Sequence, residues 1–311
     1  MPILKILLMA VVTTLLATLL SLAKASNLPK QLLNMPITLT SGEIVTLKQY
    51  QGHKPVYLKF WATWCEPCRE QMPHFEQITQ QYSDDLMVIA INLGINDDLA
   101  AVGKIQDEFN LSMPMAIDSS GDLAQAFRLL GTPYHLLFDK QMNLVHLGHE
   151  DDSVLDNKIA LISREKPLDL LADDAMTETA ELLTLNLNES KPHALFFTAT
   201  WCDWYLKDSR SAVSQQCIAA QQSVNQFAQQ FENIAWQGII SRLWTGEAEL
   251  SRYVKKYQIK HPIAIDASNT LFHQYTVKEL PSLVVVKNGK ILFKTSDFSN
   301  QESLAKQLSL L

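Results

Sequence analysis

A short sequence around a cysteine occurs twice in this chain, and this repeat constrains the fold more than any other feature. Three segments of the first half return in the second: KFWATWC (59–65) as FFTATWC (196–202), MPMAIDS (113–119) as HPIAIDA (261–267), and GTP (131–133) as ELP (279–281). Such self-similarity means that one structural unit is built twice. The 311 residues suffice for two domains of about 100–200 residues each.

The offsets between the repeats locate an insertion in the second copy. The offset is 137 residues at the first cysteine of each copy and 148 or 149 beyond it, where Cys68 falls on Cys217. The first copy therefore has Cys65, two residues and Cys68, whereas the second has Cys202, fourteen residues and Cys217. The alternative is that Cys217 is an unrelated buried cysteine, because free cysteines are commonly buried.

Apolar periodicity predicts a mixed α/β fold in both copies. Short apolar runs at 56–61 and 86–91 are typical of buried strands, and the apolar spacing over 69–82 predicts a helix between them. Two hairpins are predicted, and Asn288-Gly289 is a strong turn signal for the second. Their strands cover residues 134–138, 144–147, 282–286 and 291–293, and closing helices are expected at 154–163 and 301–310.

Charge and cysteine count exclude two classes of protein. The chain has 33 acidic and 26 basic residues, a net charge of −7, so nucleic-acid binding is not expected. Four cysteines in 311 residues are too few for a disulfide-based scaffold.

The N-terminus has the pattern of a targeting segment. Lys5 precedes an apolar stretch over 6–22, and Ala23-Lys24-Ala25 supplies the small residues of a cleavage site. This predicts a signal peptide, residues 1–25, and hence a periplasmic protein. The alternative is an uncleaved anchor through residues 6–22 in the inner membrane, facing the periplasm. Both place the rest of the chain in an oxidising compartment.

The motif Trp64-Cys-Glu-Pro-Cys68 carries the chemistry. Cys65 is predicted at a helix N-terminus, where the helix dipole and free N–H groups stabilise a thiolate. Two intervening residues allow the two sulfurs to bond, and Pro67 suits a first turn because it lacks an N–H. Trp64 is expected to shield the pair from water. A zinc site is the main rival, but no second Cys/His pair stands at ligand spacing, so neither metal nor cofactor is expected.

Residues 37–165 resemble the TlpA/ResA-type thiol–disulfide oxidoreductases of the thioredoxin fold. The resemblance is carried by FWATWCEPC, by Pro73, and by Gly131-Thr-Pro133 before a strand. It implies a mixed sheet flanked by helices, with Cys65 as the exposed nucleophile and Cys68 as the resolving thiol. It also implies that Pro133 is a cis-proline facing the disulfide and that the Thr132 backbone pairs with the substrate.

The chain departs from the thioredoxin pattern at two positions. Thioredoxins proper carry a buried Asp six residues before the first cysteine, where this chain has Lys59 in one copy and Phe196 in the other. Lys59 is either a proton-transfer group for Cys68 or a strand-end residue whose amine reaches solvent. ResA-type members carry a Glu where this chain has Gln71, which weakens an assignment to cytochrome maturation.

The second copy resembles the thioredoxin fold more weakly, through TATWC and Leu280-Pro281. Cys202 and Cys217, with Pro281 beside them, form a structural disulfide, a second redox pair or two unpaired thiols. In a straight helix their Cα atoms would lie about 22 Å apart, so pairing requires the insertion to loop out. A peroxidatic site is disfavoured by Ala199, and copper binding with His261 has no support from spacing.

The sequence thus predicts an α/β protein of two tandem thioredoxin-like domains, 26–165 and 182–311, joined by an acidic linker at 166–181. The expected function is periplasmic thiol–disulfide exchange, as reductase or isomerase, on protein substrates, with a DsbD-like membrane protein as electron donor. The alternative is a redox-linked adaptor or binding protein whose second domain recognises a client.

Overall fold

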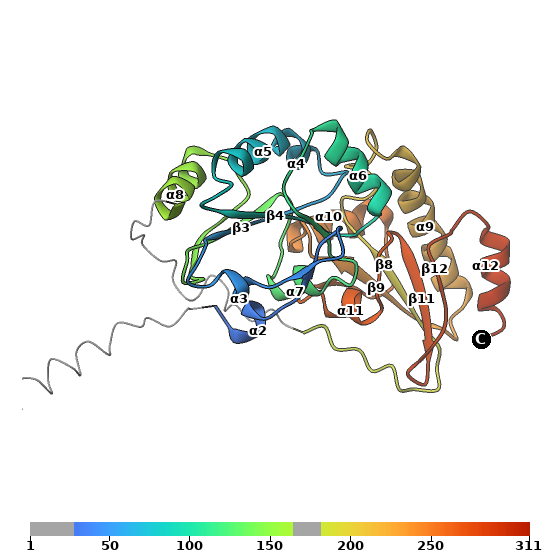
Figure 1. Ribbon diagram of the computed structural model, residues 1–311. Helices are drawn as coiled ribbons and strands as arrows, with labels where there is room; N and C mark the ends of the chain where they lie inside the picture. The colour runs from blue at the N-terminus through green and yellow to red at the C-terminus, as the bar shows by residue number, and fades with distance from the viewer. Residues whose placement is uncertain (1–27, 164–181) are drawn as a thin grey trace, which may run out of the picture.

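A computed structural model describes residues 28–163 and 182–311, here called the N-terminal half and the C-terminal half (Figure 1). The predicted signal peptide, 1–25, and the predicted linker, 166–181, lie outside the described residues. Within these two ranges, no helix is both long and apolar enough to cross a membrane.

The N-terminal half is built on a five-stranded mixed sheet of order β5-β4-β3-β6-β7. The central strand β3 pairs in parallel with β4 and antiparallel with β6, which forms the predicted hairpin with β7. The strands are β3 (Val56–Trp61), β4 (Met87–Asn92), β5 (Met115–Ile117), β6 (Tyr134–Phe138) and β7 (Leu144–Gly148). A small hairpin, β1 (Ile37–Thr38) and β2 (Ile44–Val45), precedes them.

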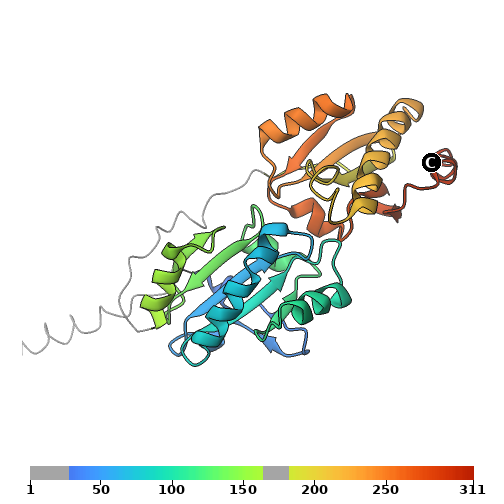
Figure 2. The same cartoon turned by 90° about the horizontal axis from the view of Figure 1, so that it is seen from above.

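Helices cover both faces of this sheet, which explains why all six residues of β3 are buried. In Figures 1 and 2, α5, α6 and α8 lie over one face, and Figure 1 shows α7 on the other. The helices are α2 (Lys30–Leu33), α3 (Leu47–Tyr50), α4 (Glu66–Glu70), α5 (Met72–Gln81), α6 (Leu99–Glu108), α7 (Asp122–Ala126) and α8 (Ser153–Ser163).

The single helix predicted over 69–82 is wrong, because the structure breaks it into α4 and α5 at Gln71. Gln71 ends α4 and also caps α5, and Pro73 stands in the first turn of α5. A proline ring clashes with the carbonyl four residues before it, so it favours the start of a new helix. The apolar residues that predicted the helix, Met72, Phe75 and Ile78, all lie after the break, so their spacing carries no sign of it.

The C-terminal half repeats this architecture with the sheet order β10-β9-β8-β11-β12. Parallel and antiparallel pairs occur in the same places as in the first sheet. The strands are β8 (His193–Thr198), β9 (Ala235–Ser241), β10 (Ile263–Asp266), β11 (Ser282–Lys287) and β12 (Lys290–Thr295), and the helices are α9 (Ser211–Gln230), α10 (Glu247–Tyr257), α11 (Thr270–Gln274) and α12 (Gln301–Leu308). The predicted fold class, two mixed sheets flanked by helices, is confirmed.

The two halves lie side by side (Figure 2) and meet through residues that are equivalent in the repeat. The backbone N–H of Asn96 donates to the carbonyl of Lys278, and that of Trp244 donates to the carbonyl of Leu130, both at 2.9 Å. Asn96 corresponds to Trp244, and Leu130 to Lys278, at the repeat offset of 148. The interface is therefore approximately two-fold symmetric.

Further contacts obey the same symmetry. The rings of Trp64 and Trp201, which precede the first cysteine of each copy, stack with centroids 4.9 Å apart. His273 binds Asp122, and Gln125 binds Thr270 at 3.5 Å, again between equivalent positions of α7 and α11. One continuous hydrophobic cluster runs from the first sheet into the second through these tryptophans.

Candidate functional site

The Cys65–Cys68 pair stands where β3 gives way to α4. Cys65 is the N-cap of α4, and its Sγ accepts a hydrogen bond of 3.2 Å from the Cys68 backbone N–H. The two cysteines form a disulfide with Cα atoms 5.2 Å apart. Pro67 occupies the first turn, where a missing N–H leaves no helical bond unmade. On reduction, the free N–H groups and the helix dipole at this end favour a thiolate on Cys65.

The loop before β6 carries the expected cis-proline. The Thr132–Pro133 peptide bond is cis, as is Leu280–Pro281 at the equivalent place of the C-terminal half. Pro67 and Thr132 line the same cavity, so the loop lies beside the cysteine turn. The His149 Nδ1–H donates to the Pro133 carbonyl at 2.6 Å, which ties the loop to the end of β7.

Gln71, at the break between α4 and α5, connects this loop to the sheet. Its Nε2 donates to the His149 carbonyl at 3.1 Å, so its Oε1 is the acceptor for His135 Nε2–H, also at 3.1 Å. His135 Nδ1 must then accept from the Tyr57 hydroxyl, at 2.6 Å. Burial and the positive charge of Lys59 hold the pKa of His135 well below its usual value, which fits this neutral tautomer.

Lys59 does not reach solvent, so the strand-end alternative is wrong. Its side chain is 0% exposed, and Nζ has no hydrogen-bond partner within the described part of the chain. Nζ lies 5.1 Å from the centre of the Phe75 ring. Burial lowers the pKa of Lys59 from 10.5 to about 7, although the charge of Asp151 opposes the change.

Cys65 is not exposed, in contrast to the expectation for a nucleophilic cysteine of this type. It is 0% exposed, and the C-terminal half contacts the residue next to it. The Tyr205 hydroxyl accepts a hydrogen bond of 3.0 Å from the Glu66 backbone N–H, directly beside Cys65. Trp64 is covered by Trp201 and Trp244 and donates from Nε1 to the Ile95 carbonyl at 2.7 Å. These contacts were not predictable from the residues around Cys65, because their partners Tyr205, Trp201 and Trp244 belong to the other half.

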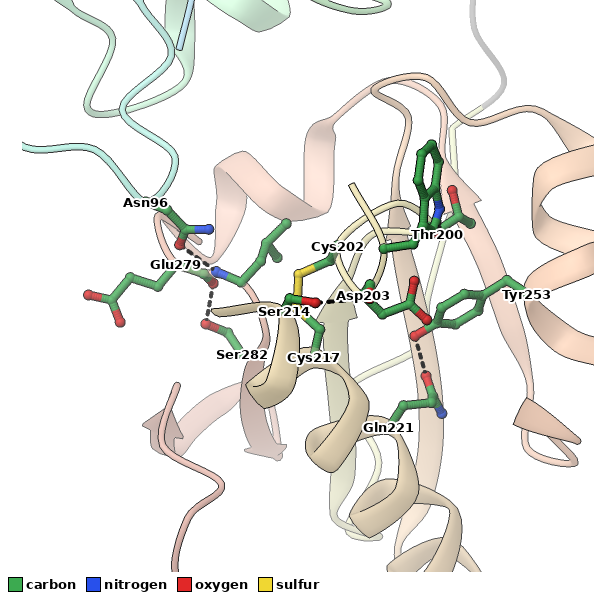
Figure 3. The surroundings of a disulfide bond; sticks show 12 residues. Asn96, Thr200, Cys202, Asp203, Ser214, Cys217, Gln221, Tyr253, Glu279 and Ser282 are labelled. Carbon is green, nitrogen blue, oxygen red and sulfur yellow. Dashed lines mark hydrogen bonds between the residues drawn. A yellow bond between two sulfur atoms is a disulfide. The ribbon is translucent and has the colours of Figure 1, made fainter. Parts of the chain in front are cut away.

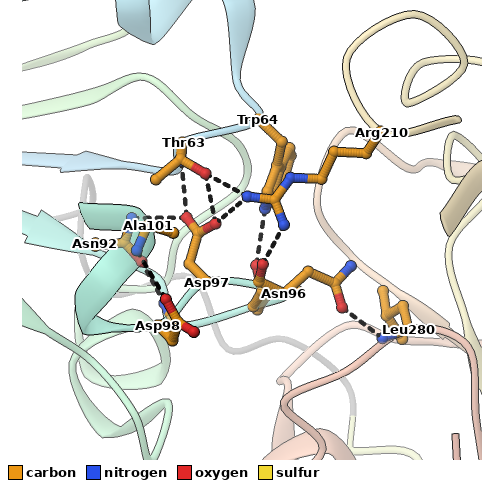
Figure 4. Close-up of polar contacts among 11 residues, drawn as sticks. Thr63, Trp64, Asn92, Asn96, Asp97, Asp98, Ala101, Arg210 and Leu280 are labelled. Atoms are coloured by element: carbon orange, nitrogen blue, oxygen red, sulfur yellow. Dashed lines mark hydrogen bonds and ion pairs between the residues drawn. The ribbon is translucent and has the colours of Figure 1, made fainter. Parts of the chain in front are cut away.

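Arg210, a residue of the insertion in the C-terminal half, binds residues of the N-terminal half next to Trp64 (Figure 4). Its Nη2 lies 2.7 Å from Asp97 Oδ1 and 2.5 Å from Thr63 Oγ1, and Nη1 donates to the Asn96 carbonyl. The Asp97 carboxylate is fully buried and also accepts from the Thr63 backbone N–H at 2.8 Å. A buried ion pair with this many hydrogen bonds depends on both partners.

The insertion, 203–216, loops out as the pairing of Cys202 with Cys217 requires, but only part of it faces water. Asp203 is buried and binds Lys256 Nζ at 2.7 Å and the Tyr257 hydroxyl. Leu206 is buried in the core, and the last residues of the insertion form the start of α9. Asp203, Arg210 and Ser214 have protein partners, whereas Lys207, Asp208 and Ser209 are exposed to solvent.

Cys202 and Cys217 are bonded to each other at the base of the insertion (Figure 3). Their Cα atoms are 6.1 Å apart across a sequence separation of 15. Cys217 lies within α9, and Ser214 Oγ, one turn earlier, donates to the Asp203 carbonyl at 2.9 Å. The repeat register identified this pairing; its redox or structural role stays open.

Comparison with known proteins covers the N-terminal half. A sequence profile of the AhpC/TSA family matches residues 28–147. The thioredoxin-like protein YneN of Bacillus subtilis is 32% identical over 124 residues, which make up 39% of this chain and 72% of YneN. The thiol-disulfide oxidoreductase ResA of Halalkalibacterium halodurans is 30% identical over 148 residues, 47% of this chain and 81% of that protein.

Among solved structures, StoA from Bacillus subtilis is 21% identical, with a TM-score of 0.35 over 40% of this chain and 92% of its own. The family match over residues 28–147 includes the cysteine turn and the cis-proline loop described above. Through its N-terminal half, the chain belongs to the thioredoxin-like thiol-disulfide oxidoreductases.

Proposed function

We propose that this oxidoreductase acts on protein disulfides in the periplasm, as a reductase or isomerase, through Cys65 and Cys68. The observation that carries the proposal is the position of Cys65 at the N-terminus of α4, bonded to Cys68 and beside the cis-Pro133 loop. A cysteine in such a position has a lowered thiol pKa in known proteins and is the one that attacks.

Thiol–disulfide exchange with the substrate takes place in two steps. In the reduced protein, the Cys65 thiolate attacks one sulfur of the substrate disulfide, forms a mixed disulfide and releases the other substrate sulfur as a thiolate. The Cys68 thiolate then attacks Cys65 Sγ and releases the second substrate thiolate. Two electrons and two protons pass to the substrate, and the Cys65–Cys68 disulfide remains.

The neighbouring residues assist these steps. Trp64 excludes water from the sulfurs, and Pro67 keeps the turn free of an unmet N–H. Thr132, next to the cis-Pro133, presents its backbone to an extended substrate segment. A substrate can reach Cys65 only after Tyr205 has moved away, because the sulfur is fully covered.

The cycle needs a dithiol donor that reduces Cys65–Cys68 again. We assign this role to a DsbD-like membrane protein, which fits export through residues 1–25 or anchoring through 6–22. An oxidising compartment supplies no other steady source of thiols.

The test is insulin reduction by the full chain in the presence of dithiothreitol, with the Cys65→Ser, Cys68→Ser double variant as control. Turbidity that rises faster with the parent chain than with the variant supports the proposal, and equal rates would refute it. The reduction potential separates the directions of electron flow, since about −270 mV suits a reductant and about −120 mV an oxidant.

A second candidate, a redox-linked adaptor, is favoured by the complete burial of Cys65 under the C-terminal half. In that case the C-terminal half recognises a client, and the redox chemistry is secondary. The double variant distinguishes the two, because an adaptor without its cysteines still restores the phenotype of a deletion strain, whereas an enzyme without them does not.

A further inference from the structure

A cavity of about 680 Å³ lies between the two halves, beside the cysteine turn. The C-terminal half supplies most of its wall, and that wall is aromatic. The residues concerned are Trp201, Trp204, Tyr205, Trp244 and Tyr253. We propose that this cavity binds an apolar or aromatic side chain of the substrate polypeptide, close in sequence to the cysteine that Cys65 attacks. This inference rests on the proposed function and adds to it a class of substrate.

The position of the cavity relates it to the reaction. Its other wall contains Pro67, which lies between the two cysteines, and Thr132, which precedes the cis-Pro133. A side chain held there lies within a few residues of a sulfur that approaches Cys65. Tyr205 lies between the cavity and the buried disulfide. It lines the cavity, and its hydroxyl accepts a hydrogen bond from the backbone N–H of Glu66, the residue next to Cys65.

Thr132 also carries an unused hydrogen-bonding group. The residue is 2% exposed, and its Oγ1 finds no partner in residues 28–163 or 182–311. A buried hydroxyl without a partner is costly, so its presence in the wall of a cavity points to a ligand that completes it. A peptide backbone running along the loop has the N–H and C=O groups to do so.

The charged residues of the lining do not favour a strongly charged occupant. Lys256 is paired with Asp203 at 2.7 Å, and Arg252 is paired with Glu249. Each cation therefore already has its counter-ion, and most of the remaining lining is aromatic, with Pro67, Thr132 and Thr200 beside the rings. Tyr253, drawn in Figure 3 beside the second disulfide, directs its hydroxyl to Gln221 and presents its ring to the cavity.

Trp204 completes the argument because it is large, apolar and 60% exposed. Its Nε1 donates to the Thr200 carbonyl at 3.2 Å, which holds the indole over the cavity. Exposed tryptophans beside a cavity are typical of binding sites, where they bury a large area on a ligand at small entropic cost. A flat aromatic wall accepts aromatic and branched side chains more readily than polar ones.

The experiment compares two peptides that differ at one position. Each contains one cysteine in a mixed disulfide with glutathione, preceded by phenylalanine in one peptide and by serine in the other. The fully reduced full chain is mixed with each, and the rate constant of reduction is followed by intrinsic fluorescence. We expect the phenylalanine peptide to react about ten-fold faster, the ratio that a difference of 1.4 kcal/mol gives.

Trp204→Ser should bring the two rate constants within about two-fold of each other, and Trp204→Phe should restore most of the preference. Leu292→Ser is the matched control, since Leu292 is an exposed apolar residue of β12 outside the cavity lining. It should leave the ten-fold ratio intact. Equal rates for both peptides with the parent chain, or a preference that survives Trp204→Ser, would overturn the inference.

Failure of the underlying function has a different signature, namely no reduction of either peptide by a chain whose Cys65 and Cys68 are free thiols. A binding measurement guards against a Trp204→Ser protein that does not fold. Peptides with serine in place of cysteine are titrated into the oxidised parent chain, and the phenylalanine peptide should bind about ten-fold more tightly. Equal affinities would again overturn the inference.

Discussion

Replacing Lys59 by methionine should stabilise the protein at neutral pH. The Lys59 side chain is fully buried, its amine has no partner within the described residues, and burial lowers its pKa from 10.5 to about 7. At 1.36 kcal/mol per pH unit, this shift corresponds to roughly 5 kcal/mol by which the charged lysine destabilises the folded state. Methionine has a similar length and no charge, so the variant avoids this cost.

The sign of the pH dependence follows from the two protonation states. Below pH 7 the amine is protonated in both folded and unfolded protein, and the whole cost is present. Between pH 7 and 10.5 the folded protein has lost a proton that the unfolded chain still holds, so stability rises with pH. The advantage of Lys59→Met should therefore be largest at or below pH 7 and should disappear near pH 10.

The assay is urea unfolding of the oxidised full chain at pH 6.5, 8.5 and 10, with the free energy of unfolding compared between parent and variant. Other groups that titrate in this range are shared by parent and variant and cancel in the difference. Lys104→Met, at an exposed position of α6, is the control and should change stability by no more than about 0.5 kcal/mol. Parallel pH curves for the parent and Lys59→Met would refute the reasoning.

Three further predictions concern the cysteines and their cover. Cys68→Ser should accumulate mixed disulfides on Cys65, because the resolving thiol is absent. These adducts should be visible on a non-reducing gel of periplasmic extract, and Pro133→Thr should form them more weakly. A gel without Cys65-dependent adducts would contradict the proposal that the substrates are proteins. Arg210→Ala removes the partner of the buried Asp97 and should speed alkylation of reduced Cys65 several-fold, measured by mass mapping against the parent chain; an unchanged rate means that Arg210 does not hold the cover. Replacing both Cys202 and Cys217 by serine should lower the free energy of unfolding by about 3 kcal/mol in the chain-entropy account of a loop of this length, and an unchanged midpoint in urea would argue against a structural role.

The elements of the N-terminal half were predictable because local patterns determine them. The apolar run at β3 and the turn between β6 and β7 lie within single segments, and the structure has them at the predicted places. The break at Gln71 did not follow from the apolar spacing, because the apolar residues of that segment lie in α5 alone. Pro73 was the available signal, since a proline at that place favours a helix start over a helix interior.

The covered state of the site was not predictable in the same way. The contacts beside Cys65 join distant parts of the chain. Glu66 and Tyr205, for example, are 139 residues apart in the sequence. No periodicity links such residues. The repeat alignment located Cys217 opposite Cys68, but the inserted residues have no counterpart in the first copy, so it could not show that they supply Tyr205 and Arg210 to the interface. The symmetric backbone contacts, of Asn96 with Lys278 and of Trp244 with Leu130, agree with the repeat, because both join the same two positions of each copy.

The paired backbone bonds of Asn96 with Lys278 and of Trp244 with Leu130 join two parts of one chain. Two separate proteins with this interface would separate on dilution, whereas parts joined by a short linker meet at an effective concentration of about a millimolar. At that concentration, an interface with a dissociation constant of only about 0.1 mM stays closed about nine-tenths of the time. Covalent linkage therefore permits an interface that is weak enough to open in every catalytic cycle and yet is occupied at any protein concentration.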